Sequence, residues 1–251
     1  MAIHKTDGVV LRRQDMRETS LMLTFFTKDF GKIKGLMKGV RGVRAPHGSS
    51  CFELFALDEV VFYDRARSDI FTISQCDLKD YFFPLRNSLE RLAYAAYFIE
   101  LLDSVTALSD KSEEIFMLLL NSLEFLQKDA SARRVARVFE IKLLGLLGIM
   151  PNLGACLLCG EKQLAVSRFS LRHGGMICGA CSGQDTASYP ILPGTVRFIE
   201  HVRDSSFQQV WRIKVSQRVG KDLESLLRRF LRFHIERRLK TLDFLRSIAA
   251  P

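Results

Sequence analysis

The sequence lacks any apolar run approaching the ~20 residues that a membrane-spanning helix needs. The N-terminal stretch also lacks the apolar core of a secretory signal peptide, because Asp7 follows soon after the start and interrupts it. We therefore expect a cytoplasmic protein without a membrane partner. With 47% hydrophobic residues over 251 positions, the chain can bury a substantial core, which excludes a largely disordered protein.

The common catalytic signatures are also absent. The sequence has no G-x-x-x-x-G-K-S/T phosphate loop, no G-x-S-x-G elbow and no H-E-x-x-H zinc motif. His234 and Glu236 form the H-x-E half of a zinc deaminase signature, but that signature has its C-x-x-C pair downstream, whereas both such pairs lie upstream here. We therefore predict a protein that binds its partners and is not an enzyme.

Cysteine is the most informative residue type that is present. Four of the six cysteines form two C-x-x-C pairs with eighteen residues between them: Cys156, Cys159, Cys178 and Cys181. This spacing is typical of four thiolates that surround one structural Zn²⁺ tetrahedrally and leave no open position for catalysis. Two disulfides or four unrelated thiols are the alternatives. Between the pairs, the apolar residues at positions 169, 171, 176 and 177 predict a small hairpin with Gly174 and Gly175 at its tip.

The first eighty residues alternate between strand-like runs and glycine-rich or charged turns. Strands are expected at residues 6–13, 20–27, 31–38, 52–63 and 70–80. Five strands in so short a segment favour a closed barrel over an open sheet with two bare edges. We predict an OB-type barrel, with an SH3-like barrel as the alternative.

The rest of the chain has helical periodicity. Apolar residues recur at helical spacing in residues 89–97, 115–123 and 135–143, a further helix begins at 195, and residues 216–248 indicate one long closing helix. The predicted fold is thus α+β and multidomain. It has an OB barrel at residues 1–81 and a helical domain at 82–251, with residues 152–190 inserted as the zinc-binding module, called the four-cysteine module below.

The charge of the chain predicts a polyanionic partner. The net charge is +9, and residues 1–46 carry ten Lys or Arg against four Asp or Glu. A cationic face on the barrel could neutralise several phosphates, with an affinity that falls steeply as salt is added; a merely solvated surface is the alternative. The barrel residues that we predict to bind nucleic acid are Arg12, Arg17, Lys32, Lys34, Lys38, Arg41 and Arg44.

Two further basic clusters lie in the predicted helices. In the closing helix, Arg218, Lys221, Arg228 and Arg232 repeat at spacings that place them on one side, opposite the apolar residues. Of these, Arg228 and Arg232 are predicted to extend the nucleic-acid interface; a role in keeping the helix solvated is the alternative.

The second cluster comprises Arg133, Arg134 and Arg137. If the helix begins near Ser131, these cations occupy its first two turns, where the helix dipole disfavours positive charge. An acidic peptide tail or a phosphate could bind there, so we predict a partner-peptide site; ordinary surface arginines are the alternative.

The order of these parts resembles the bacterial RecO family of recombination mediators. The residues that carry the resemblance are 6–11 (TDGVVL), 17–20 (RETS), 26–27 (FT), 31–32 (GK), 38–41 (KGVR) and the later four-cysteine cluster. It covers nearly the whole chain. Lys38 and Arg41 match the family's basic Lys-Gly-x-Arg segment, whereas Gly42 stands where a further basic residue is expected.

Membership of this family would imply an OB barrel followed by a helical domain with the four-cysteine module. It would also imply that the protein binds single- and double-stranded DNA and anneals complementary strands. Its location would be the cytoplasm, in association with the nucleoid. Partners would be RecR, the acidic C-terminal tail of single-strand-binding protein and, indirectly, RecA. A zinc-ribbon RNA-binding or transcription-associated factor is the alternative function.

Overall fold

The computed structural model describes residues 2–16, 18–40, 52–63, 69–128, 131–162, 167–210, 215–235 and 237–249. The chain divides into two compact units, one made of residues 1–135 with 239–251 and the other of residues 136–238. We call them the first and the second unit. The domain limits expected from the sequence remain predictions.

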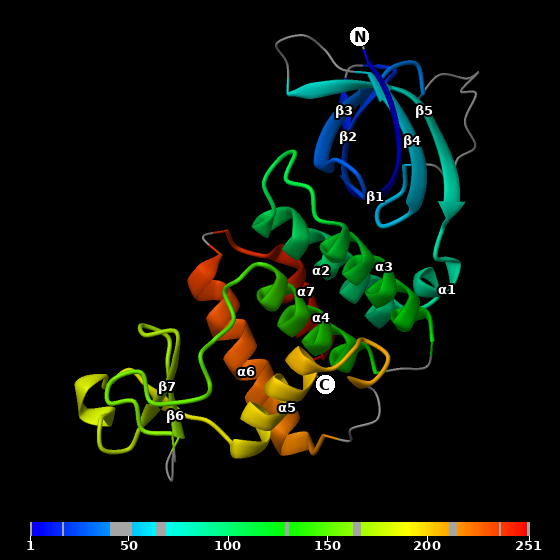
Figure 1. Ribbon diagram of the computed structural model, residues 1–251. Helices are drawn as coiled ribbons and strands as arrows, with labels where there is room; N and C mark the ends of the chain where they lie inside the picture. Colours follow the sequence, from blue (N-terminus) through cyan, green and yellow to red (C-terminus); the bar gives the residue numbers. More distant parts are fainter. Residues whose placement is uncertain are drawn as a thin grey trace. The chain divides into compact units, whose positions relative to one another are not determined.

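The first unit begins with a closed five-stranded barrel (Figure 1). Its strands are β1 (Ile3–Met16), β2 (Ser20–Thr27), β3 (Gly31–Met37), β4 (Leu57–Tyr63) and β5 (Ile70–Asp80). Around the barrel they follow the order β1-β2-β3-β5-β4, and only β3 and β5 pair in parallel. The predicted barrel is confirmed, although β4 begins later than the expected residue 52.

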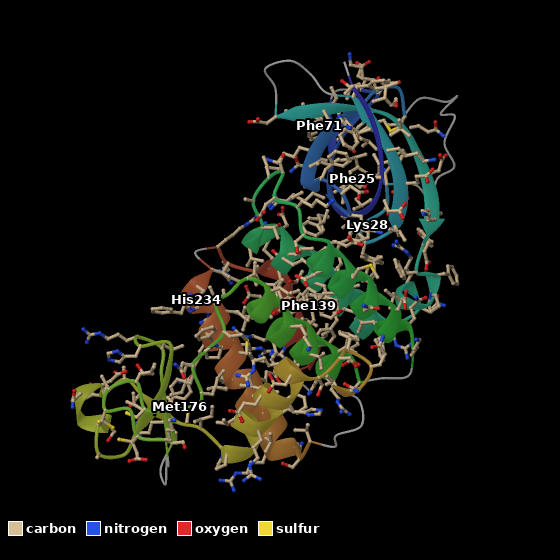
Figure 2. The ribbon with its side chains drawn as sticks, in the orientation of Figure 1. Phe25, Lys28, Phe71, Phe139, Met176 and His234 are labelled. Carbon is tan, nitrogen blue, oxygen red and sulfur yellow. The ribbon has the colours of Figure 1, made fainter. Side chains whose placement is uncertain are left out.

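Alternating side chains of these strands fill the barrel. Leu21, Leu23 and Phe25 point inward from β2 and are buried, together with Val10 of β1 and Phe62 of β4. Figure 2 shows Phe25 inside the barrel. Because neighbouring residues of a strand face opposite sides, the intervening positions carry the side chains that can reach solvent or another element.

In the described part of the chain, four helices and the first turn of α4 (Ala132–Leu146) complete the first unit. The four helices are α1 (Phe83–Arg86), α2 (Leu89–Val105), α3 (Glu113–Gln127) and α7 (Lys240–Ala249). Two serines define helix starts: Ser88 Oγ accepts a hydrogen bond from the first turn of α2, and Ser112 Oγ does so for α3. Helix α7 packs on α2, where the Glu100 carboxylate accepts hydrogen bonds from the Lys240 and Thr241 amides (3.0 and 2.8 Å).

The prediction of one long closing helix over residues 216–248 was wrong. The structure has two helices, α6 (Gln217–His234) in the second unit and α7 in the first. Ile235 ends α6 in an extended conformation (φ −105°, ψ 109°), and its side chain and that of Leu239 are buried. The cap that starts α7 comes from Glu100, far away in the sequence, so no local pattern marks the break.

The second unit combines helices with the small sheet of the four-cysteine module. Its helices are α5 (Pro193–Asp204), α6 and most of α4 (Ala132–Leu146), and its strands are β6 (Ser167–Ser170), β7 (Gly175–Cys178) and β8 (Tyr189–Pro190). The sheet order is β7-β6-β8, and β6 with β7 forms the predicted hairpin. Asp222 on α6 accepts a hydrogen bond from the amide of Leu192, the residue before α5 (3.0 Å), and so connects the two helices.

Among the helices of the described ranges, none combines the length and apolar character that crossing a bilayer would require.

Candidate metal centre and nucleic-acid interface

The four predicted cysteine ligands lie together. The sulfur atoms of Cys156, Cys159, Cys178 and Cys181 are all within 4.8 Å of one another, and the Sγ atoms of Cys159 and Cys178 are 3.7 Å apart. Thiolates at about 2.3 Å from a tetrahedral Zn²⁺ would be about 3.8 Å apart. The donor set and its spacing therefore fit a closed metal site.

Backbone hydrogen bonds hold the two C-x-x-C turns in place. In the first turn, the Gly160 amide donates to the Cys156 carbonyl (2.9 Å), and Gly160 has a positive φ of 79°, which glycine adopts without strain. The Leu157 amide donates to the Met176 carbonyl (2.9 Å), which joins this turn to β7. Because Cys178 ends β7, the hairpin brings the second turn to the first.

The thiols influence one another strongly. Burial opposes ionisation of Cys156, but the amides of Cys178, Cys159 and Leu158 outweigh it and lower the Cys156 pKa to about 6. The neighbouring thiols of Cys178 and Cys159 raise the Cys181 pKa to about 12. Four thiolates this close would repel one another, so a cation bound between them would favour the ionised forms.

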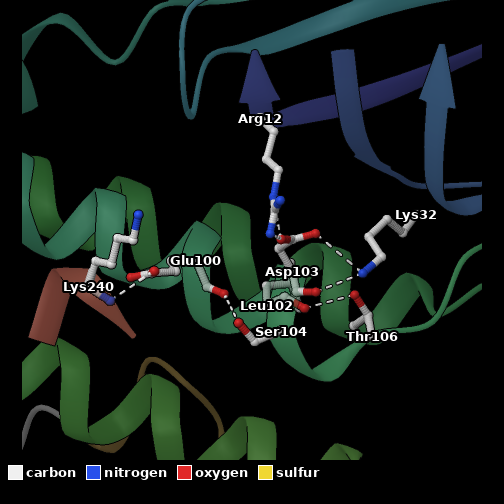
Figure 3. Close-up of polar contacts among 8 residues, drawn as sticks. All are labelled: Arg12, Lys32, Glu100, Leu102, Asp103, Ser104, Thr106 and Lys240. Carbon is white, nitrogen blue, oxygen red and sulfur yellow. Dashed lines mark hydrogen bonds and ion pairs between the residues drawn. The ribbon is translucent and has the colours of Figure 1, made fainter. Parts of the chain in front are cut away.

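Two of the predicted barrel cations hold the first unit together. Lys32 is only 7% exposed, and its Nζ donates to the Asp103 carbonyl (2.7 Å) and lies 3.3 Å from Asp103 Oδ1. Arg12 Nε donates to Asp103 Oδ2 (2.6 Å), as Figure 3 shows. One nearly buried carboxylate thus neutralises both cations, which connects β1 and β3 to the end of α2.

The environment of Lys32 arises from the segment that follows α2. Leu108 forms an isolated β-bridge with Lys32, and the Ser109 amide donates to the Lys32 carbonyl (2.9 Å). Gly31 permits this approach, because a Cβ atom there would lie 2.1 Å from the Asp110 carbonyl oxygen. Lys32 lies two residues from Lys34, on the same face of β3. Unlike Lys34, it is covered by a segment that lies more than seventy residues later in the sequence.

The other cations at or near the predicted interface of the barrel divide into three groups. Lys34 and Lys38 are exposed. Lys28 and Arg13, which are also near the predicted interface, form ion pairs with Glu113 and Glu53 (3.2 and 2.6 Å). The remaining predicted residues lie outside the described part of the chain: Arg17, Arg41 and Arg44.

Helix α6 carries a row of exposed cations, which we call the α6 stripe: Arg218, Lys221, Arg229 and Arg232. Within the described residues, none of the four forms an ion pair with a carboxylate. Arg228, predicted to belong to this row, is instead half-buried and pairs with Glu224. Arg229 takes its place, with its guanidinium 4.5 Å from the centre of the Tyr189 ring. Arg229 lies eleven residues, or about three turns, after Arg218, but Arg228 is also close to this row, so helical spacing alone could not have distinguished the two.

The predicted peptide-binding arginines have different environments along α4. Arg133 is exposed and lies 4.0 Å from Glu90, and Arg134 is partly buried, which lowers its pKa. Arg137 is 5% exposed and pairs with Glu140 at 2.9 Å. Only Arg133 and Arg134 lie in the first turn and reach the surface.

The two units differ in charge. The first unit contains 21 Lys or Arg and 20 Asp or Glu, whereas the second contains 16 and 8. The net charge of +9 therefore resides almost entirely in the second unit.

Comparison with known families agrees with this arrangement. Residues 1–82 match the family described as "Recombination protein O N terminal", and residues 86–243 match "Recombination protein O C terminal". The chain belongs to the recombination protein O family. The resemblance seen in the sequence is thereby confirmed.

Similar proteins cover nearly the full chain. A "DNA repair protein RecO" of Alkaliphilus metalliredigens is 32% identical over 93% of this chain and 94% of its own length. The protein of the same description from Acetivibrio thermocellus is 30% identical over 97% and 96%. That of Moorella thermoacetica is 31% identical over 98% and 91%. The chain is thus a DNA repair protein of the RecO family.

Proposed function

We propose that this protein is a recombination mediator that binds single- and double-stranded DNA and anneals complementary strands. With RecR, it would help to load RecA onto single strands coated by single-strand-binding protein. Membership of the family carries this proposal. The exposed cations of Lys34, Lys38 and the α6 stripe support it, because a DNA backbone needs such groups as partners.

The mechanism would be physical and would break no covalent bond. Two single strands repel each other through their phosphates, and cationic side chains that bind both strands reduce this repulsion. Holding the strands on one protein also raises their effective concentration. Base pairing would then select the complementary partner, so the protein needs no catalytic residue.

The structure changes which predicted residues we assign to this interface. We retain Lys34, Lys38 and Arg232, and we add Arg218, Lys221 and Arg229 from the α6 stripe. Arg17, Arg41 and Arg44 remain predictions from the sequence. Arg12, Lys32 and Arg228 are paired with carboxylates, and we assign them to stabilising the fold.

We infer that the four-cysteine module holds one Zn²⁺ through its four sulfur atoms. Zn²⁺ prefers tetrahedral thiolate ligands, and four protein ligands would leave no position for a substrate. The metal would therefore stabilise the module, while the chain's own residues bind DNA.

The acidic tail of single-strand-binding protein would bind at the first turn of α4. Arg133 and Arg134 provide guanidinium groups there, at the end of the helix where the dipole favours a negatively charged ligand. Because Arg137 pairs with Glu140 in the interior, we leave it out of this site.

Timed annealing tests the proposed function. Two complementary oligonucleotides are coated with single-strand-binding protein and mixed with or without the full chain, and duplex formation is followed by fluorescence. We expect the chain to accelerate annealing by at least about tenfold, which corresponds to about 1.4 kcal/mol in the barrier. An unchanged rate, in a preparation that binds the uncoated strands, would contradict the proposal.

A further inference from the structure

A series of aromatic rings connects the four-cysteine module to the end of α6. The ring of Phe169 on β6 lies 5.9 Å from that of Tyr189 and 5.9 Å from that of Phe230, measured between centroids. Phe230 in turn lies 4.4 Å from His234, and His234 lies 5.4 Å edge-to-face from Phe233. Such separations lie in or at the lower edge of the range of about 4.5 to 7 Å in which aromatic rings attract one another.

The series begins in the core and ends at the surface. Phe169 and Phe230 are buried, whereas His234 is exposed and Phe233 is 58% exposed. Figure 2 shows His234 at the end of α6. Because His234 packs on the buried ring of Phe230 and also contacts Phe233, these two exposed rings are anchored to the core of the unit.

The exposed rings adjoin the α6 stripe. Phe233 follows Arg229 by four residues and Arg232 by one, so on a helix it shares a side with Arg229. Along the helix axis, the stripe extends about 21 Å from Arg218 to Arg232, at a rise of about 1.5 Å per residue. A row of cations thus ends beside a pair of anchored aromatic rings.

We propose that Phe233 and His234 form a stacking site for a base of single-stranded nucleic acid, while Arg229 and Arg232 bind the adjoining phosphates. Proteins that bind single strands combine these two elements, a cationic track and exposed aromatic side chains. In a duplex, the faces of the bases are covered by their neighbours, so this site selects unpaired strands. The inference rests on the proposed DNA binding. It adds that this site binds single-stranded DNA, and it names the residues that recognise the strand.

Charge complementarity favours nucleic acid as the occupant over an apolar protein surface. The second unit has twice as many cations as carboxylates, and the stripe has no carboxylate partner within the described residues. An apolar partner would leave these charges without compensation, whereas the backbone of a single strand supplies one negative charge for each nucleotide.

Replacing Phe233 in the full chain tests the site. Phe233→Ala should weaken binding of a fluorescein-labelled oligothymidine about tenfold, which is within the contribution of one stacked base, and should change binding of a duplex of the same length less than about twofold. Phe233→Leu should behave like Phe233→Ala, because leucine is apolar but cannot stack. Phe233→Trp should restore binding of the single strand.

Phe83→Ala is the matched control, because Phe83 is similarly exposed (63%) but belongs to the first unit. It should leave binding of both oligonucleotides unchanged. Two outcomes would show that the proposed stacking site is wrong while the proposed function stands. Phe233→Ala could bind the single strand as tightly as the unmodified chain does, or it could lose affinity for the single strand and the duplex equally. If the unmodified chain binds neither oligonucleotide, the proposed function fails and the stacking site fails with it.

Discussion

The two units differ in the balance between their cations and carboxylates. In the first unit, cations and carboxylates are nearly equal in number, and Asp103 neutralises both Arg12 and Lys32 in a nearly buried network. In the second unit, cations are twice as numerous as carboxylates, and those of the α6 stripe face solvent. A basic residue in the sequence is therefore a candidate for DNA binding only if the fold leaves it without a carboxylate partner.

The largest effect is expected from the metal centre of the second unit. Zn²⁺ contributes about 10 kcal/mol or more to folding in small zinc modules, so Cys178→Ser should release the metal and unfold the four-cysteine module. Metal content is measured by mass spectrometry, and hydrogen exchange should increase in residues 152–190 but not in the barrel. Cys76→Ala, which removes a thiol from the barrel core, should keep the metal.

Full metal content in Cys178→Ser would exclude this ligand set. An increase of exchange in the barrel as large as that in the module would show that the two units do not depend differently on the metal.

The Asp103 network provides the next largest effect, in the first unit. Asp103→Ala leaves the nearly buried Lys32 and the partly exposed Arg12 without this carboxylate, which we expect to lower the free energy of unfolding by about 3 kcal/mol in urea titrations. The matched control is Glu113→Gln, which removes the partner of Lys28 from an exposed ion pair and should cost less than about 1 kcal/mol.

Equal losses in these two variants would contradict the view that Asp103 stabilises the unit through burial. A large loss in Asp103→Ala combined with stronger binding of DNA would show instead that Arg12 and Lys32 become available to phosphates when the carboxylate is removed.

Much of this architecture could be predicted because its determinants are local. The strand-like runs separated by glycine-rich or charged turns and the spacing of the cysteines are visible in short stretches of sequence, and they led to the barrel and to the cluster of four cysteines. The contacts that were missed join distant positions. Asp103 lies 71 residues from Lys32, and Glu100 lies 140 residues from Lys240, so neither the covered lysine nor the start of α7 has a local signal.

Prediction from the sequence was also limited for the charged residues of α6. Helical spacing identified the side of the helix but not which of Arg228 and Arg229 faces solvent, because neighbouring positions differ by about 100° around the axis. Packing of Arg228 against Glu224 and of Arg229 over Tyr189 decides between them. Tyr189 belongs to the four-cysteine module, so this choice depends on tertiary structure.

The salt dependence of single-strand binding tests the central claim, that unpaired cations and not paired ones bind DNA. For the double variant Arg218→Gln/Arg232→Gln, the slope of log affinity against log salt should become shallower by about 1.4, since each lost phosphate contact contributes about 0.7. Arg13→Gln/Lys28→Gln removes two cations of the first unit that pair with carboxylates and should leave the slope unchanged. An unchanged slope in the first variant, or equal changes in both, would contradict the account.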